Sequence, residues 1–528
     1  MLHVALYQQS MLEVDPDEIR LPEDSFERQL RQVLPRMFTP SEFADFYEAD
    51  GAGSRCPLQL IGMELLKHRY NVSDVEVVKR CRRDLSWRYA IGLKIGEEPP
   101  STATLSRFRA KLRQRKGADF VFRRSLELAQ AEELIPDQAL QAIDSTNTDC
   151  LGAVIDTFNL ITAGIRQVIR KVARCLDTRT DELARQWGLE RYLARSIKGA
   201  VSIDWSNVSA QSALITEEVR DADRLVQLVE DLKLTWPDDV TSALQLLQQV
   251  ARQDVEELAD GTFRVARGTA PGRVISVTDP EARHGRKSKS KTINGFKMNI
   301  TGTIESQFVT GIAMTDASTP DAKPTPQLLA QTEALGLKPD RVVGDAAYGT
   351  GPNRRRCREL GVDVVSKLGT PRKGAVAKRD FAIDLAAMRV TCPEGNSTTR
   401  HCHIKDPNGS DTRVAKFVFD AATCQRCPLR TKCSKATREG QGRVIVLNAY
   451  EQELQDLQAF NALPEAPQVL RKRSAVERLI SHLVRMGMRQ ARFFGLHMAQ
   501  FQGFMTAAAY NLQRAFTLLA RRRRWGTT

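Results

Sequence analysis

The spacing of apolar and polar residues predicts a run of short helices at the start of the chain. In residues 58–66 apolar side chains recur three and four positions apart, which is the period of a helix with a buried face. Ser73 and Glu76 have the spacing of a capping box, so a new helix is expected there. Two prolines at 99 and 100 break the chain before residues 105–116, a helical stretch rich in Arg and Lys. Such a series is typical of a helix-turn-helix-like DNA-binding unit, and equally of a helical bundle with a solvated, charged face.

The pattern then changes to a strand, followed by a long helical stretch. Residues 138–145 are predicted to form a buried strand that ends in Asp144. Helical periodicity extends from about residue 154 to residue 258, which indicates an all-helical insertion. This insertion carries no chemical motif.

Strand patterns return after the insertion. Residues 273–278 have strand character, and the Gly, Ser and alternating Lys of 283–291 predict a flexible basic loop. Apolar and polar residues alternate in 296–304 and again in 308–314, which predicts an antiparallel hairpin. A helix over 326–335 and a short buried strand over 341–344 follow, and the strand leads into Asp345.

This order of elements predicts an α/β protein with an RNase H-like catalytic core. In that topology the first and fourth strands lie side by side, so Asp144 and Asp345 are expected to be close in space despite their separation in the sequence. A later helix carries Glu477. The expected division of the chain is a helical N-terminal DNA-binding domain (1–130), the core (131–150, 272–380 and 465–515), a helical insertion (151–271), a Cys-rich insertion (381–464) and a basic tail (516–528).

Composition narrows the partners and the compartment. A chain of 528 residues is too long for one hydrophobic core. No apolar run approaches the roughly 20 residues of a membrane span, and the first residues lack signal-peptide features, so a cytoplasmic protein with reduced cysteines is expected. Lys and Arg number 78 against 64 Asp and Glu, a formal charge of +14. This excess favours a nucleic-acid partner, although many basic proteins bind none.

Five cysteines fall between positions 392 and 433 and include one CxxC pair. In a reducing compartment such spacing indicates a structural zinc site, and the alternative is a group of unliganded thiols. Zinc would explain how a segment with few large apolar residues folds. The candidate ligands are Cys392, Cys424, Cys427 and Cys433, with His401, Cys402 and His403 as substitutes.

Three carboxylates carry the candidate chemistry. Asp144, Asp345 and Glu477 each lie at the end of, or beside, an apolar element, where an unpaired acid is costly. Carboxylates bind divalent cations, and a pair of such ions drives in-line attack on a phosphodiester. The alternative for Asp144 is a turn, because Ser, Thr and Asn follow it. Asp279 is a competing acid, but its Asp-Pro step is typical of a turn.

The chain resembles the DDE transposases of bacterial insertion sequences, in the group marked by a Tyr, Arg, Glu, Lys signature around the third acid. The resemblance covers most of the chain. The residues at the four signature positions are Leu470, Arg473, Glu477 and Val484, and Arg485 stands one residue after the lysine position. The other matching segments are 70–76, 100–109, 279–285, 294–297, 344–349 and 506–512.

The resemblance implies the site, the cofactors and the partners. Asp144, Asp345 and Glu477 would be the catalytic acids and would hold two Mg2+ or Mn2+ ions. The residues expected to bind DNA or phosphate are Arg473, Arg485, Arg107, Arg109 and Lys111. The protein would bind terminal inverted repeats, cut the element ends and join them to new DNA in the bacterial nucleoid, as a dimer or higher multimer. The alternatives are an RNase H-like nuclease without strand transfer and a transposase-derived DNA-binding protein with an unused catalytic centre.

Overall fold

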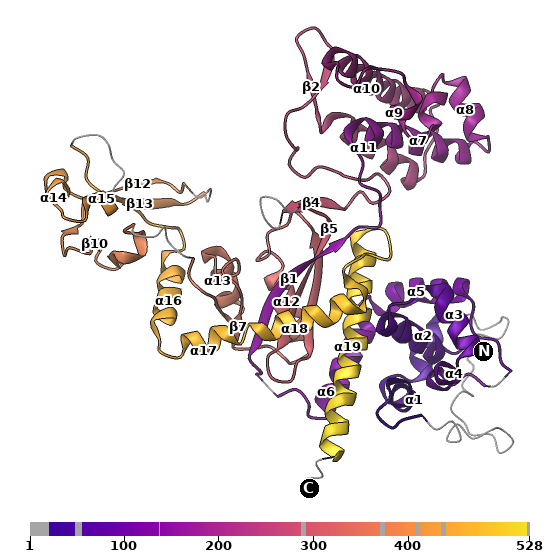
Figure 1. Cartoon of the computed structure of the whole chain (residues 1–528), viewed down its shortest axis with the longest axis horizontal. Coiled ribbons are helices and arrows are strands. Elements are labelled where there is room, and N and C mark those ends of the chain that lie inside the picture. Colours follow the sequence, from indigo (N-terminus) through magenta and orange to yellow (C-terminus); the bar gives the residue numbers. More distant parts are fainter. Residues whose placement is uncertain are drawn as a thin grey trace.

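The computed structural model describes residues 21–47, 55–94, 96–136, 138–286, 292–369, 375–407, 409, 411–433 and 440–524. A central sheet lies between the N-terminal helices, a second helical unit and a small β unit (Figure 1). No helix among these residues is both long enough and apolar enough to span a bilayer.

The N-terminal part is helical, as predicted. Ser73 Oγ accepts the backbone N–H of Glu76 and caps a helix at the predicted place. The long C-terminal helix α19 (Leu496–Arg524) packs against this part and against the sheet (Figure 1). The N-terminal elements are α1 (Phe26–Met37), η2 (Pro40–Phe46), α2 (Pro57–Tyr70), α3 (Asp74–Arg83), α4 (Leu85–Ile91), α5 (Thr102–Lys116) and α6 (Phe120–Ala131).

The central sheet is mixed. Its path is β4–β5–β1–β7–β8, and β6 also pairs with β5. Strand β1 is antiparallel to β5, with Asp144 opposite Ile300, and parallel to β7, with Ala142 opposite Val343. The predicted adjacency of the first strand and the strand before Asp345 is therefore confirmed, as is the hairpin of β5 and β6. The strands are β1 (Gln141–Asp149), β4 (Arg283–Arg286), β5 (Thr292–Thr303), β6 (Val309–Asp316), β7 (Arg341–Val343) and β8 (Asp363–Val365), and the sheet helices are α12 (Thr325–Ala334) and α13 (Gly351–Glu359).

Strand β1 is longer than predicted. It continues through the Ser, Thr and Asn residues to Asp149, so Asp144 lies within the strand and not at a turn. The cause is pairing with β5, which offers a backbone partner to every residue of β1 up to Asp149 opposite Gly295.

Two other local predictions are wrong. Residues 273–278 form only one isolated bridge, from Val274 to Arg283, because the backbone N–H and C=O of Val274 bond the side chain of Gln253 and not a second strand. Residues 283–286 are strand β4 and not a loop; residues 287–291 lie outside the described part. The basic tail is helical as far as Arg524, because Phe516, Leu518 and Leu519 continue the packed face of α19. Its last four residues are not described.

The insertion between β1 and β4 is helical and has its own apolar core. Twenty-four-residue α10 packs against α7 and α11, and the core of this unit is separate from that beneath the sheet. The unit lies at the top of Figure 1. Its elements are α7 (Thr157–Cys175), α8 (Thr180–Gln186), η3 (Glu190–Leu193), α9 (Ile197–Ala200), α10 (Val208–Asp231), α11 (Asp238–Arg252), β2 (Val255–Glu257) and β3 (Phe263–Val265).

The Cys-containing segment forms two small three-stranded sheets before the chain returns to the core through helices. These sheets share a small core around Phe381 and Phe417. The elements are η4 (Lys378–Asp380), β9 (Ala382–Asp384), β10 (Arg389–Thr391), β11 (Ser397–Thr398), β12 (His401–Lys405), β13 (Arg413–Val418), α14 (Ala421–Gln425), α15 (Arg430–Cys433), β14 (Val444–Val446), α16 (Glu451–Ala462), α17 (Ala466–Arg471), α18 (Ser474–Leu483) and a π-helical turn (Val484–Met488).

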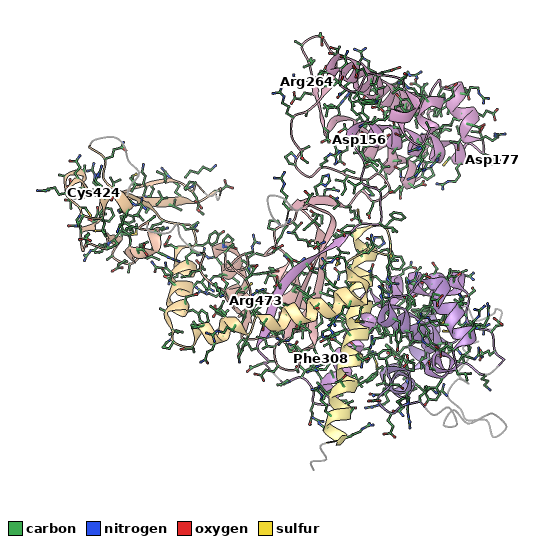
Figure 2. All side chains as sticks on the ribbon, in the orientation of Figure 1. Asp156, Asp177, Arg264, Phe308, Cys424 and Arg473 are labelled. Atoms are coloured by element: carbon green, nitrogen blue, oxygen red, sulfur yellow. The ribbon has the colours of Figure 1, made fainter. Side chains whose placement is uncertain are left out.

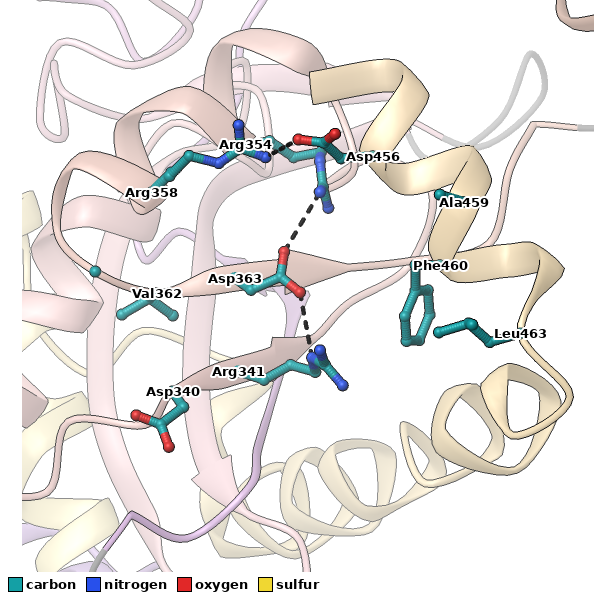
Figure 3. A pocket seen from close by; sticks show the side chains of 11 residues that line it. Asp340, Arg341, Arg354, Arg358, Val362, Asp363, Asp456, Ala459, Phe460 and Leu463 are labelled. Carbon is teal, nitrogen blue, oxygen red and sulfur yellow. Dashed lines mark hydrogen bonds and ion pairs between the residues drawn. The ribbon is translucent and has the colours of Figure 1, made fainter. Parts of the chain in front are cut away.

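Helix α16 borders a cleft of about 560 Å³ at the β8 edge of the sheet (Figure 3). Asp363 pairs there with Arg341 and Arg354, and Arg358 pairs with Asp456 (Figure 3). Asp363 and Arg341 are the first residues of their parallel strands, whereas Asp345 follows the last residue of β7. Since ligands in such sheets bind beyond the carboxyl ends of the strands, this cleft is not the catalytic candidate.

Candidate active site

Asp144 lies on β1 where the strand passes beneath α18. Its side chain is 18% exposed, and its Oδ1 accepts the backbone N–H of Ser145 at 2.8 Å. Burial raises the pKa of Asp144 to about 6. Ser145 and Arg473 oppose this rise, whereas Asp345 and Glu477 add to it. The three acids predicted from sequence are thus close enough for two of them to act on the charge of the third.

Asp345 stands two residues after the end of β7, just before the turn that follows Gly344. Its Oδ1 accepts the backbone N–H of Ala347 at 2.9 Å, which fixes the carboxylate at the end of the strand. The parallel pairing of β7 with β1 brings this turn to the same region of the sheet as Asp144. Tyr348 closes the turn with a fully buried ring.

Arg473 joins the other two acids. Its guanidinium donates to Asp144 Oδ2 at 2.8 Å and to Glu477 Oε1 at 2.5 Å. Glu477 stands in the first turn of α18, four residues after Arg473, and its side chain is 53% exposed. The helix is held over the sheet by an apolar face that includes Val476 and Leu479. Arg473 therefore lies between the strand acid and the helix acid, and it is labelled beside the sheet in Figure 2.

The three acids are hard oxygen donors of the kind that divalent cations prefer. Within the described residues, however, no group of three or more His, Cys, Asp or Glu side chains is arranged to hold a metal ion. The contacts of Arg473 account for this at the acids, because its positive charge is hydrogen-bonded to two of them.

The two departures from the family signature have structural counterparts. Leu470, at the tyrosine position, is buried in the core and is not available to a ligand. Val484, at the lysine position, begins the π-helical turn that ends α18. Arg485 is exposed and donates to Ser481 O and to the ring of His482, so it points along its own helix and not toward the acids.

The competing acid Asp279 serves another purpose. Its Oδ1 accepts the backbone N–H of Gly495 at 3.1 Å, and Glu281 accepts that of Leu496 at 2.8 Å. Both carboxylates thus satisfy N–H groups at the start of α19. Asp279 is fully buried, and burial raises its pKa.

The basic residues predicted on α5 have three different environments. Arg107 is exposed, and Lys111 donates to the carbonyl of Phe46 at 2.5 Å. Arg109 is buried and pairs with Glu64 and Asp74, so the prediction that it binds phosphate is wrong. The physical reason is that a buried carboxylate at Glu64 requires a cation, which Arg109 provides.

Four cysteines line one small cavity in the Cys-containing segment. They are the four predicted zinc ligands, Cys392, Cys424, Cys427 and Cys433. Burial raises the pKa of Cys433, and the neighbouring thiols of Cys424, Cys427 and Cys392 raise it further. The backbone N–H of Arg443 points to Cys424 Sγ at 3.4 Å. The substitutes on β12, His401, Cys402 and His403, are exposed and do not line this cavity.

Sequence reasoning missed Arg489, which follows the π-helical turn. It is exposed and donates to Thr146 Oγ1 at 3.2 Å and to Asn147 O at 2.9 Å, on the strand that carries Asp144. No motif marks it. Its one signal is its place a few residues beyond the signature helix.

Comparison with protein families gives two matches. Residues 391–516 match the Transposase DDE domain, and residues 16–111 match the Transposase domain (DUF772). No curated protein matches the chain. The first match includes Arg473 and Glu477 but begins after Asp144 and Asp345. A DDE domain implies an RNase H-like core and divalent metal ions, and a transposase implies DNA binding. Two parts of the chain are therefore similar to transposase domains, and the DDE domain matched by residues 391–516 is that of a phosphoryl-transfer enzyme.

Proposed function

We propose that this chain is the transposase of a bacterial insertion sequence, and that Asp144, Asp345 and Glu477 are its catalytic acids. The observation that carries the proposal is the Arg473 contact, which joins Asp144 on the sheet to Glu477 on a helix more than 300 residues later. The influence of Asp345 on the pKa of Asp144 adds the third acid. The protein would bind terminal inverted repeats, cut the element ends and join them to target DNA, as a dimer or higher multimer.

Each acid has a separate task in this proposal. Asp144 and Asp345 would hold two Mg2+ or Mn2+ ions, and Glu477 would hold one of them. When bound, such ions make a water more acidic and stabilise the charge on the leaving 3′ oxygen. The freed 3′-OH would then attack a phosphodiester of the target DNA, with the target 3′ oxygen leaving.

Arg473 would change partners when DNA and metal bind. Its planar guanidinium suits a bidentate contact with a phosphate. Because it is 30% exposed, it can reach a phosphate at the mouth of the site once it leaves the carboxylates. Arg107, Lys111 and Arg485 are further exposed cations proposed to contact DNA.

One assay separates this function from its rivals. The purified protein is incubated with Mg2+, a target plasmid and labelled duplexes taken from the two borders of the DNA segment that encodes this chain. Cleavage followed by joining of the labelled 3′ ends supports the transposase. Cleavage without joining would identify a nuclease, and binding without cleavage would identify a DNA-binding protein with an unused catalytic centre.

We also propose a structural Zn2+ bound by Cys392, Cys424, Cys427 and Cys433. The four thiols are not arranged to hold a metal ion in the described structure, so zinc binding requires them to move closer together. The proposal is supported by their shared position around one cavity of about 30 Å³ and by the turn at Cys392, in which the N–H of Gly395 donates to Cys392 O. The surrounding core is small, with seven buried apolar residues. Metal binding would therefore supply folding energy that the segment lacks. The unit 381–464 and the helical unit 151–271 would each be a folded insertion in the catalytic core.

The zinc proposal predicts about one zinc ion per chain in protein purified without chelators. Cys427→Ser should lose that zinc and expose the segment to proteolysis. Cys175→Ser is a matched control, because Cys175 is exposed in the helical insertion. Zinc-free wild-type protein with a protected 381–464 segment would contradict the proposal.

A further inference from the structure

The chain segment after α18 is attached to the strand that carries Asp144. The backbone N–H of Asp149 donates to Arg489 O at 2.8 Å, and that of Ala491 donates to Asp149 O at 2.8 Å. Asp149 and Gln490 form an isolated parallel bridge. Residues 489–491 are therefore hydrogen-bonded to the last residue of β1.

The guanidinium of Arg489 contacts β1 close to Asp144, at Thr146 and Asn147. Its guanidinium bonds Thr146 Oγ1, and Thr146 follows Asp144 by two residues. Side chains two apart on a strand point to one face and are separated by about 6.7 Å along it. Thr146, which Arg489 contacts, is thus separated from the proposed catalytic acid Asp144 by about 6.7 Å along the strand, close to the length of one nucleotide step. No carboxylate among the described residues forms an ion pair with it.

A groove of about 480 Å³ begins at Arg489. One wall is the segment 484–493, and the other is formed by Lys67 and residues 71–74 of the N-terminal part. The acid in this wall, Asp74, is neutralised by Lys67 at 2.6 Å and by Arg109 at 2.8 Å. The groove therefore presents the unpaired charge of Arg489 and no unpaired carboxylate.

The two walls are fixed to one another. The guanidinium of Arg492 donates to Val72 O and to Asn71 Oδ1 across the base of the groove. Both walls lie within the segments that match transposase domains, 16–111 and 391–516. The groove connects the N-terminal transposase domain with the strand of the proposed active site.

We propose that this groove seats the sugar-phosphate backbone of the element end, and that Arg489 binds the phosphate next to the one that is cut. The proposal rests on the proposed function and adds the path of the DNA and a positioning residue to it. Arg473 would contact the scissile phosphate itself, and Arg489 would fix the register of the strand beside it.

The test uses full-length protein in EDTA, so that binding is measured without cleavage. The probes are the border duplexes described above, each with one phosphate in turn replaced by a neutral methylphosphonate. Arg489→Ala should weaken binding to the unmodified duplex about tenfold and lower the slope of log affinity against log salt by about one. At the phosphate next to the cut, the wild type should lose affinity on neutralisation, whereas Arg489→Ala should lose nothing further.

Two further variants distinguish the loss of a phosphate contact from a merely structural effect of the Arg489→Ala substitution. Arg179→Ala removes an exposed cation, paired with Asp181, in the helical insertion and should bind like the wild type. Arg489→Lys restores the charge and should restore the salt slope. If the losses from Arg489→Ala and from neutralisation add at every phosphate, Arg489 only supports β1 and the inference is overturned. In that case wild-type cleavage and joining of the same duplexes leaves the proposed function standing.

Discussion

Arg473 forms the contact that unites the candidate active site. Without it, Asp144 and Glu477 would repel one another across the space between strand and helix. With it, the two carboxylates share one cation. Arg473 and a divalent ion therefore compete for the same oxygens.

This competition predicts that Arg473→Gln binds Mn2+ more tightly than the wild type does in the absence of DNA. The expected gain is about threefold to tenfold at pH 8, corresponding to roughly 1 kcal/mol for a partly exposed ion pair. Titration calorimetry or the Mn2+ electron paramagnetic resonance signal measures it. The same variant should cleave DNA more slowly, because it also loses the phosphate contact.

Arg478→Gln is the control for this prediction. Arg478 stands next to Glu477 and bonds Ser474 without touching the acids, so the net charge changes equally. An Mn2+ affinity that is the same in Arg473→Gln and the wild type would show that Arg473 does not occupy the metal site.

At the residue scale, strand context and element order predicted Asp144 and Asp345, and the partly kept signature predicted Arg473 and Glu477. The contacts of Arg473 with Asp144 and Glu477 agree with the expectation that these residues lie together. The burial of Arg109 could not be predicted. Its partner Glu64 is 45 residues away, and only the packing of α2 against α5 brings the two together. Arg489 could not be predicted for a similar reason, since its proposed role depends on a bridge to the distant strand β1.

At the element scale, the helical insertion contains a buried acid, and the pKa of that acid differs between the folded and the unfolded insertion. Glu218 on α10 is buried, accepts the hydroxyl of Thr162 and leaves its second oxygen without a partner. Burial raises the pKa of Glu218 to about 8. Between the unfolded value near 4.3 and pH 8 the folded state holds a proton that the unfolded state has released. The stability of this unit must therefore fall as the pH rises through that range.

Glu218→Gln should remove this pH dependence and stabilise the insertion at pH 8 by a few kcal/mol, on the order of two to three. Hydrogen exchange of α10 at pH 6 and pH 8 measures the local stability. Glu217→Gln is the control, because Glu217 is an exposed neighbour on the same helix. Wild-type exchange with no more local opening at pH 8 than at pH 6, after correction for intrinsic rates, would contradict the prediction.

Elements with strong periodicity could be predicted, and those defined by distant partners could not. Apolar and polar residues alternate clearly in the hairpin of β5 and β6, and the apolar strand before Asp345 is short but has clear ends in the sequence. The second half of β1 has the composition of a turn, and only pairing with β5 makes it a strand. For residues 273–278 the apolar composition predicted a strand that does not form, because burial alone does not supply a strand partner.

At the scale of the whole molecule, the N-terminal helices and the catalytic part form one packed body. His68 bonds Thr506 on α19, Arg69 bonds Gln513, and Gly487 approaches Asn71 too closely for a side chain. The buried pair of Glu64 and Arg109 lies behind this interface, and Lys67, His68 and Arg109 hold the pKa of Glu64 well below its usual range against the effect of burial. The N-terminal part is thus coupled to the strand that carries Asp144.

Glu64→Leu should destabilise this body by about 3–5 kcal/mol, because it leaves Arg109 buried with one carboxylate fewer. Chemical denaturation measures the change. The double variant Glu64→Leu, Arg109→Met removes both charges and should recover much of the loss. Equal stability of Glu64→Leu and the wild type would show that the pair is not buried in solution.

The most direct test of the central claim is DNA cleavage by three single variants, Asp144→Asn, Asp345→Asn and Glu477→Gln. Each removes one negative charge and keeps the size of the side chain. The assay uses Mg2+ and labelled border duplexes, and binding of the same duplexes in EDTA is measured in parallel. We predict that all three variants bind DNA as the wild type does and that none cleaves it at a measurable rate. Cleavage at the wild-type rate by any one of them would contradict the assignment of a single site built from these three acids.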